Sequence, residues 1–215
     1  MSVPDIKSAR MALVDPHAFS SAGSGQRRRA AMTATMREHL GDLWRSATEG
    51  ARVDGLALGC VGSLARGELG PLSDLDLVLL YRGQDVKSVN AIADKLWYPL
   101  WDNGIRFDHS VRTPQQSREA GARDLTAAIG QLDLTWIAGD ETLVMAVRST
   151  TAHDWRRDAR TRLPELLEAL ASRHHREGDL AQLVDPDLKE ARGGLRDMGI
   201  LRAMTAAWLA DRPHG

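Results

Sequence analysis

Two aspartates separated by a single residue could bind a metal ion. Asp74 and Asp76 stand at the start of an apolar run that ends at Leu80. Because successive side chains of a β-strand point to opposite faces, the two carboxylates share a face, about 6–7 Å apart along the chain. Like charges beside an apolar run are costly unless a cation joins them, and carboxylate oxygens suit Mg²⁺ or Mn²⁺. The pair therefore indicates a divalent-metal site.

A glycine and a serine upstream could hold a phosphate group. Gly62 and Ser63 follow residues 56–61, an apolar stretch that predicts a strand. Glycine lets the backbone approach a ligand closely, and a serine hydroxyl with neighbouring N–H groups at the start of a helix can bind an anion. Alone, Gly-Ser is typical of an ordinary turn and Asp-x-Asp of a solvated strand start. Together, with strands on both sides, they suggest a metal-bound nucleoside triphosphate.

The combined motif resembles a family signature. The Gly-Ser pair, ten intervening residues and the Asp-x-Asp pair are similar to the signature of the DNA polymerase β-like nucleotidyltransferase superfamily. The resemblance implies a third carboxylate on the next strand, where Asp108 is the only acid. This group would complete the metal shell and help to take the proton from the attacking hydroxyl. A surface aspartate paired with Arg106 or Arg112 is the alternative interpretation.

Hydrophobic spacing predicts the elements that position these residues. Amphipathic helices are expected over residues 27–49 and 89–100. Residues 105–112 alternate cleanly and predict a third strand, with His109 on its apolar face as a core histidine. Later segments are predicted to be helical, with Pro164 opening the last of them: 114–121, 123–131, 141–148 and the chain from 153 to 176.

A second motif precedes a predicted helix near the end of the sequence. Gly193 and Gly194 lead into an apolar helix face, and Lys189, Arg192 and Arg196 surround them. Free N–H groups at a helix start, with cations nearby, suit a phosphate or an acidic loop. A glycine hinge with exposed charges is the alternative.

This second motif resembles one particular family. Residues 188–197 are similar to the Lys-Glu-Gly-x-Gly-Gly-Leu-Arg-Asp segment of bacterial protein-PII uridylyltransferase/uridylyl-removing enzymes, except that Ala191 stands where the family usually has glycine. Similar stretches extend the resemblance to about residues 50–210: 96–101, 109–113 and 137–140. The resemblance implies a bifunctional nitrogen-signalling enzyme that attaches a nucleotide to a tyrosine of a PII regulatory protein. In that family a His-Asp phosphohydrolase domain and ACT domains follow.

The resemblance also implies roles for individual residues. Asp74, Asp76 and Asp108 would carry Mg²⁺, with Mn²⁺ as the alternative ion, and would act in catalysis. The reaction would be an in-line attack of a tyrosine oxygen on the α-phosphate, with release of pyrophosphate. The implied nucleotide-binding residues are Gly62, Ser63, Arg66, Lys189, Gly193, Gly194 and Arg196. Nothing in these residues distinguishes UTP from ATP, so transfer of UMP or AMP stays open.

Composition narrows the class of protein. The chain has 215 residues, 43% hydrophobic and 27% charged, and a formal net charge of −1. Because nucleic-acid binding depends on a basic surface that neutralises phosphates, no nucleic-acid partner is expected. No apolar run approaches the ~20 residues of a membrane span, so no membrane association is expected. Cys60 is the single cysteine, which excludes an intrachain disulfide and fits a cytoplasmic protein.

We therefore predict an α/β fold: a polymerase β-like nucleotidyltransferase core with a small mixed sheet, followed by a helical subdomain. The core is assigned to residues 26–145 and the subdomain to residues 146–215, after a flexible N-terminal lead, residues 1–25. The chain is expected to be the N-terminal segment of a longer protein. Two rival functions remain: a nucleotidyltransferase with another acceptor, and a catalytically silent domain that binds nucleotide and docks PII.

Overall fold

The chain folds as two compact units. The computed structural model describes residues 6–13, 23–185 and 187–208. The first unit consists of Met1–Ser117 and Asp133–Arg148, and the second of Arg118–Leu132 and Ser149–Gly215. The second unit thus includes a segment, Arg118–Leu132, that the prediction assigned to the core.

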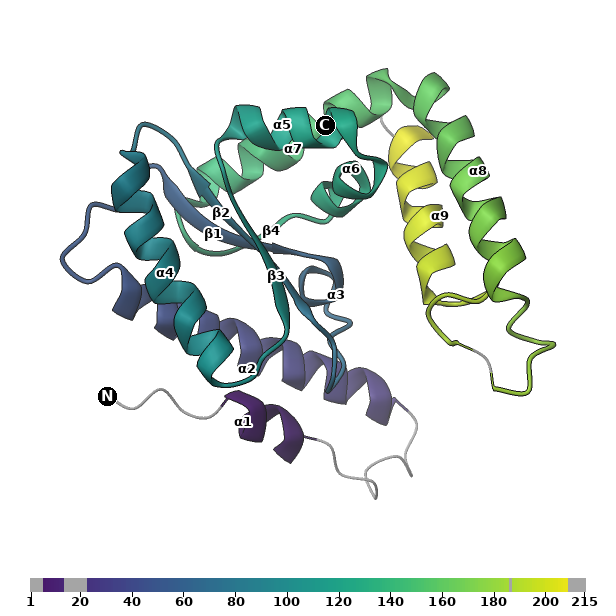
Figure 1. Cartoon of the computed structure of the whole chain (residues 1–215), viewed down its shortest axis with the longest axis horizontal. Helices are drawn as coiled ribbons and strands as arrows, with labels where there is room; N and C mark the ends of the chain where they lie inside the picture. The colour runs from purple at the N-terminus through teal and green to yellow at the C-terminus, as the bar shows by residue number, and fades with distance from the viewer. Residues whose placement is uncertain (1–5, 14–22, 186, 209–215) are drawn as a thin grey trace. The chain divides into compact units, whose positions relative to one another are not determined.

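A four-stranded mixed sheet forms the centre of the first unit (Figure 1). The strands are β1 (Leu56–Val61), β2 (Leu75–Tyr81), β3 (Phe107–Arg112) and β4 (Thr135–Gly139), in the spatial order β3-β2-β1-β4. β1 runs antiparallel to both of its neighbours, whereas β2 and β3 are parallel. The predicted α/β fold with a small mixed sheet is confirmed.

The sequence did not predict β4. Its apolar residues, which begin at Leu134, form a stretch too short to show a clear period between two helices. Gly139 ends the strand with φ at +82°, and a Cβ there would lie 2.3 Å from the Leu56 carbonyl oxygen. Close pairing with β1 defines this strand, and that long-range contact is not visible in a local pattern.

Two amphipathic helices cover one face of the sheet. Helix α2 (Ser24–Ala47) buries Met36 and Leu40, and α4 (Val86–Asp102) buries Leu96, all within the two predicted amphipathic segments. These helices pack against the inward side chains of β1 and β2: Leu56, Leu58, Cys60, Leu75, Leu77 and Leu79. The helical spacing in the sequence therefore identified this core correctly.

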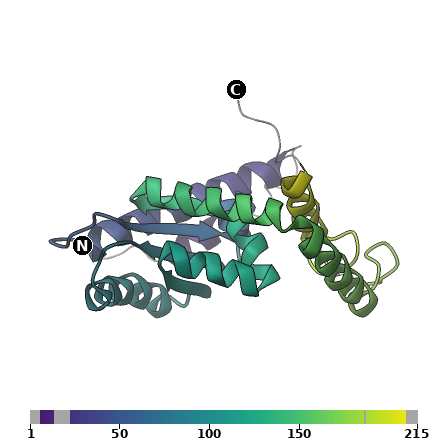
Figure 2. The same ribbon diagram turned by 90° about the horizontal axis from the view of Figure 1, so that it is seen from above.

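The opposite face is covered by the first part of α7 (Glu141–Arg157), which Figure 2 shows running along the sheet. Its contacts are Leu143, Val144 and Val147 against Ala57, Val61, Val78 and Leu80. The helix is longer than the predicted 141–148. Because Val78 and Leu80 alternate with the buried leucines of β2, Asp76 lies on the α7 side of the sheet.

A short helix lies within the predicted N-terminal lead. Helix α1 (Ile6–Ala12) carries Arg10, whose side chain is buried. The Arg10 guanidinium donates to the carbonyl oxygens of Gly70 (2.8 Å) and Ser73 (2.7 Å). It therefore holds the loop that leads into β2. The rest of the predicted lead, residues 1–5 and 14–22, lies outside the described residues.

The second unit is helical, as predicted. Its helical elements are the end of α5 (Pro114–Arg123), α6 (Leu125–Leu132), the end of α7, α8 (Ala159–Glu177) and α9 (Leu195–Trp208). Trp155 and Leu166 form a small core with Ala128 and Ala203, and the Trp155 indole N–H donates to the Ala203 carbonyl (2.8 Å). Pro164 lies inside α8 and does not open it, so that prediction was wrong; the helix tolerates one missing N–H donor.

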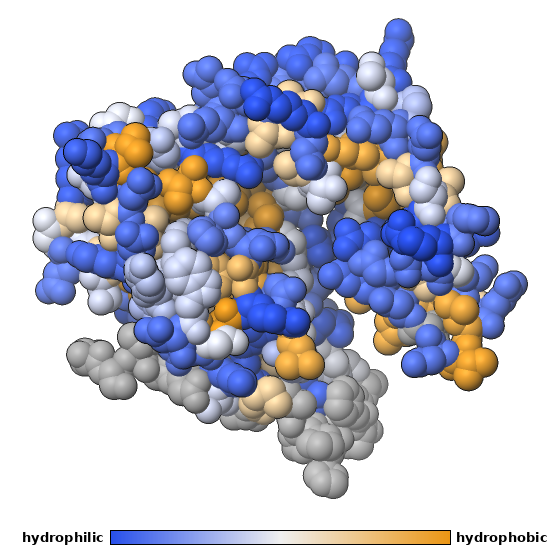
Figure 3. Space-filling view, in the orientation of Figure 1, coloured by the Kyte–Doolittle hydropathy of each residue, from blue (hydrophilic) through white to orange (hydrophobic). Residues whose placement is uncertain are grey.

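The apolar face predicted for α9 is exposed. Leu195, Met198 and Leu201 are 67%, 50% and 53% exposed, because the helix instead turns Ala203 toward Trp155. Since apolar residues occur on more than one side of α9, its sequence does not determine which side is buried. Figure 3 shows other apolar side chains scattered over a hydrophilic surface.

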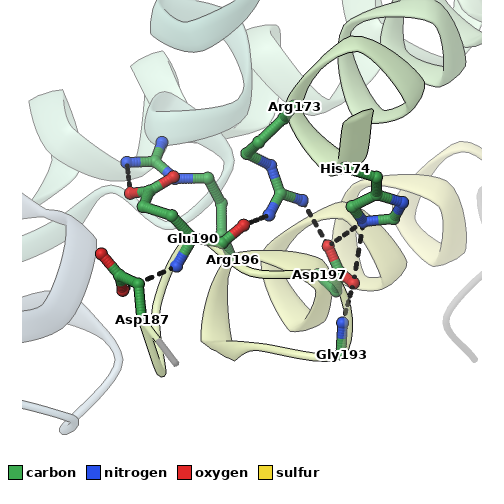
Figure 4. Close-up of polar contacts among 7 residues, drawn as sticks. All are labelled: Arg173, His174, Asp187, Glu190, Gly193, Arg196 and Asp197. Carbon is green, nitrogen blue, oxygen red and sulfur yellow. Dashed lines mark hydrogen bonds and ion pairs between the residues drawn. The ribbon is translucent and has the colours of Figure 1, made fainter. Parts of the chain in front are cut away.

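The carboxylate of Asp197 joins α8, α9 and the loop between them (Figure 4). It accepts hydrogen bonds from Arg173, from His174 Nε2 (3.0 Å) and from the Gly193 N–H (2.7 Å). Burial alone would raise the pKa of Asp197, but the hydrogen bonds from His174, Gly193 and Arg173 lower it to about 2. His174 is therefore a partly buried partner of Asp197.

We predict that Asp197→Asn lowers the free energy of unfolding by about 2 kcal/mol at neutral pH, since it weakens hydrogen bonds between a carboxylate and charged donors. Urea denaturation, with hydrogen exchange of the α9 amides, measures this loss. Asp185→Asn, at an exposed position between α8 and α9, is the control and should change stability by less than about 0.5 kcal/mol.

The difference between wild type and Asp197→Asn should depend on pH in a defined direction. Because folding lowers the pKa of Asp197, its contribution is fully present above the unfolded pKa of about 4 and is lost as pH falls toward 2. The two unfolding free energies should therefore converge between about pH 4 and pH 2. A difference that stayed constant through this range would contradict the assignment.

Candidate active site

Parallel pairing brings two carboxylates side by side. Asp76 of β2 is the register partner of Asp108 of β3, and Val61 is the partner of Asp76 on the other side. Because paired residues of neighbouring strands point to the same face, both carboxylates lie on the α7 side of the sheet. Asp76 is partly exposed and Asp108 is exposed. The two adjacent acids form an open, negatively charged site at the start of β2. We call Asp76 and Asp108 together the carboxylate corner.

The backbone at Gly62 packs directly against this corner. Gly62 has φ at +67°, and a Cβ at this position would lie 2.2 Å from Asp76 Oδ2. Any other residue would displace the carboxylate, so glycine is required here for space as well as for backbone conformation. Ser63 follows in the single turn α3 (Gly62–Ala65). The structure thus brings the Gly-Ser and Asp-x-Asp motifs together.

Asp74 is held by an arginine. It lies just before β2, and its Oδ1 forms an ion pair with Arg106 Nε (2.9 Å), while another nitrogen of Arg106 donates to the Leu72 carbonyl (3.0 Å). Arg106 therefore pairs with Asp74, not with Asp108 as the alternative interpretation proposed. Both side chains are mostly exposed, so the pair contributes little to stability and can exchange.

The three predicted carboxylates are not assembled into one cluster. In the described part of the chain, no three His, Cys, Asp or Glu side chains lie close enough together to hold a metal ion. Asp76 and Asp108 are neighbours, whereas Asp74 faces Arg106. The carboxylates of Asp76 and Asp108, with the Gly62 backbone beside them, are suitable oxygen ligands for a divalent cation. Asp74 would join them only if its ion pair with Arg106 were broken.

Arg66, a predicted phosphate contact, is bound to carboxylates. Its guanidinium donates to Glu68 (2.8 Å) and to Asp133 (2.9 Å). Burial alone would lower the pKa of Arg66, but these hydrogen bonds raise it. The side chain is therefore a charged, firmly positioned group at the end of α3, and its role toward phosphate stays a prediction.

His109 lies among aromatic rings at the edge of the sheet. Its ring centroid is 5.2 Å from that of Trp97, 5.6 Å from Trp101 and 5.4 Å from Phe107. The imidazole is on the apolar side of β3, as alternation predicted, but the residue is exposed. The interpretation as a core histidine was therefore wrong, because β3 is an edge strand and its apolar face is only partly covered.

The Gly-Gly segment lies in the second unit, and its N–H groups have partners within the chain. Gly193 donates to Asp197, Gly194 to the Ala191 carbonyl (2.8 Å) and Leu195 to the Leu188 carbonyl (2.9 Å). The free helix start expected from the sequence is therefore occupied by the segment's own acceptors. Sequence spacing could not reveal these bonds, since they depend on the path of the loop.

The charged residues of this segment differ in whether their side chains already have an ion-pair partner. Arg196 forms an ion pair with Glu190 (2.7 Å; Figure 4), whereas Lys189 is exposed. Of the predicted contacts in this unit, Lys189 is the side chain that could most readily bind a phosphate.

No helix in the described ranges combines the length and apolar character that a membrane crossing requires.

Burial raises the pKa of the Cys60 thiol to about 12, so this cysteine is an uncharged core residue.

Two families of known proteins match separate parts of the chain. Residues 46–126 match the nucleotidyltransferase domain family, and residues 161–210 match the GlnD PII-uridylyltransferase family. The first match contains the Gly-Ser and Asp-x-Asp motifs and Asp108, and the second contains the Gly-Gly motif.

Several curated relatives carry the name bifunctional uridylyltransferase/uridylyl-removing enzyme. That of Streptomyces coelicolor is 51% identical over 193 residues, which cover 90% of this chain and 23% of the relative. That of Mycobacterium tuberculosis is 46% identical over 165 residues, covering 77% and 20%. That of Corynebacterium glutamicum is 39% identical over 160 residues, covering 74% and 23%. The chain spans less than a quarter of the length of these relatives. It belongs to the PII-uridylyltransferase family and contains that family's nucleotidyltransferase domain.

Proposed function

We propose that this chain transfers a nucleotidyl group from a nucleoside triphosphate to a tyrosine of a PII signalling protein, with release of pyrophosphate. The observation that carries the proposal is the pairing of Asp76 with Asp108 on parallel strands, directly against the Gly62 backbone. The family matches and the names of the relatives support the same reaction class.

Asp76 and Asp108 would hold a divalent metal ion, Mg²⁺ or Mn²⁺. Neighbouring carboxylates supply the hard oxygen donors that a divalent cation prefers, which favours metal binding beside these two strands. Asp74 would complete the ligand set after exchanging Arg106 for the metal. When bound, the metal would neutralise charge that develops on the phosphate oxygens.

The chain's own residues would orient the reactants. Gly62 and Ser63 would hold the triphosphate, because the glycine keeps the backbone close to the carboxylates and the serine supplies a hydroxyl. Asp108 would accept the proton of the tyrosine hydroxyl. The tyrosine oxygen then attacks the α-phosphorus, the bond from that phosphorus to the bridging oxygen breaks, and pyrophosphate leaves with the electron pair.

Arg66 of the first unit is one proposed contact to the nucleotide, and the Gly-Gly segment of the second unit is proposed separately as a phosphate-binding loop. Lys189 is exposed and would bind a phosphate directly. Arg66 and Arg196 already have acidic partners, so they would act through a fixed positive charge or after partner exchange. Gly193 and Gly194 would shape the loop that presents Lys189.

The rival function is a silent domain that binds nucleotide without transfer. The Asp74–Arg106 ion pair favours it, since it occupies one predicted ligand. Intact-mass spectrometry of a PII protein after incubation with Mg²⁺ and either UTP or ATP decides between them. Added mass on the PII protein supports transfer and identifies the nucleotide. Nucleotide binding with neither added mass nor pyrophosphate release would establish the silent domain.

Asp76→Asn should lower kcat/KM for transfer by about a thousandfold or more, because it removes a metal-ligating charge at the reacting phosphate. The folded state should be retained, as judged by circular dichroism. Asp54→Asn is the matched control, since Asp54 is an exposed acid outside the carboxylate corner, and it should keep activity within about twofold. Full activity of Asp76→Asn would refute the assigned role.

Gly62→Ala should lower kcat/KM for transfer by about a hundredfold, because the Cβ of the alanine would displace the Asp76 carboxylate. Gly67→Ala is the control: Gly67 has φ at +70°, close to the +67° of Gly62, but a Cβ at Gly67 would meet no atom within 4 Å. Both variants carry backbone strain of about 1 kcal/mol, and only Gly62→Ala should lose activity. Equal effects on activity would mean that strain alone is responsible.

A further inference from the structure

The outer edge of β3 has no partner strand among the described residues. β3 stands at the end of the sheet order, beside β2 alone. The Leu75 N–H donates to the Arg106 carbonyl (3.1 Å). This bond identifies which residues of β3 direct their backbone N–H and C=O groups toward β2. Because ladder bonds alternate along a strand, the backbone groups of Phe107, His109 and Val111 point away from β2. An unpaired edge of this kind can accept an added strand.

An aromatic patch flanks this edge. We use that name for Tyr98 and Trp101 of α4 together with Phe107 and His109 of β3. The Trp101 ring centroid is 5.4 Å from that of Phe107 and 5.6 Å from that of Tyr98. Tyr98 is 59% exposed and Trp101 is 47% exposed. Exposed aromatic side chains that gather in one place are typical of protein interfaces.

The same edge carries Asp108, the proposed proton acceptor, on its other face. Asp108 lies between Phe107 and His109 in sequence, so it points away from the aromatic patch and toward the side of Asp76. A strand added to β3 would place alternate side chains on these two faces. Directly opposite side chains in neighbouring strands have Cβ atoms about 5 Å apart. One residue of such a strand would therefore enter the carboxylate corner while its neighbours contact the patch.

We propose that the outer edge of β3 binds an extended, tyrosine-bearing segment of the acceptor protein as an added strand. The tyrosine lies on the Asp108 face, and the residues before and after it lie on the aromatic patch. This inference rests on the proposed function, and it names the surface that recognises the acceptor. The free backbone edge requires an extended chain, and the adjacent carboxylates require a hydroxyl group to act on. Backbone hydrogen bonds give affinity, and the patch gives selectivity.

Trp101→Ala tests the patch. It should raise the KM for a PII protein about tenfold, while kcat and the affinity for Mg²⁺-nucleotide stay within about twofold of wild type. Trp136→Ala is the matched control, because Trp136 is 37% exposed on β4, the opposite edge of the sheet, and it should leave the KM unchanged. An unchanged KM for Trp101→Ala would overturn the proposal.

Val111→Pro tests the strand edge. Proline removes the outward N–H of Val111 and leaves the ladder to β2 intact, as proline at sheet edges does, so the KM for the acceptor should again rise about tenfold. Hydrogen exchange of wild type provides a second readout: a PII protein should slow exchange of the outward amides of β3. Unaltered exchange across β3 in the presence of a bound acceptor would contradict the added strand.

The outcomes separate this inference from the proposed function. A wild-type chain that transfers nothing to any PII protein refutes the function. A wild-type chain that transfers normally, with an acceptor KM insensitive to both variants, refutes only the docking surface. If β3 instead pairs with a second copy of this chain, the mass in solution will rise with concentration and Val111→Pro will abolish that rise without changing the KM, which also overturns the proposal.

Discussion

The repulsion between two neighbouring carboxylates is the constraint on which the proposed site depends. Asp76 and Asp108 face the same side of two parallel strands, and the Gly62 backbone closes against one of them. Two buried faces hold this geometry, since α2 and α4 cover one side of β2 and α7 covers the other. The sheet therefore fixes two like charges side by side at an open site, where a shared cation would lower their mutual repulsion.

Several features could be predicted from the sequence because their signals are local. The Gly-Ser and Asp-x-Asp motifs have a defined spacing, and both ends of that spacing meet in the structure. The amphipathic spacing of α2 and α4 identified their buried faces, since one side of each helix is much more apolar than the other. The alternation of residues 105–112 placed Asp108 and His109 on opposite faces, which is the arrangement observed.

Other features depend on contacts between distant residues. Arg106 pairs with Asp74, although the alternative interpretation of the sequence had Asp108 paired with Arg106 or Arg112. His174 binds Asp197 on another helix, and Arg10 holds a loop far along the chain. The position of β3 at the sheet edge left His109 exposed, and the burial of Ala203 left the other apolar side of α9 in solvent. The local spacing of residues in the sequence does not determine these ion-pair partners or which of these side chains are exposed.

The account's central claim is that a divalent cation lies between Asp76 and Asp108. Anomalous diffraction from crystals grown with Mn²⁺ and a non-hydrolysable nucleoside triphosphate tests it most directly. The account predicts a peak within coordination distance, about 2.0–2.6 Å, of both carboxylates, next to the phosphates and the Gly62 backbone. A nucleotide bound with its metal elsewhere, and with these two acids turned away from it, would contradict the claim.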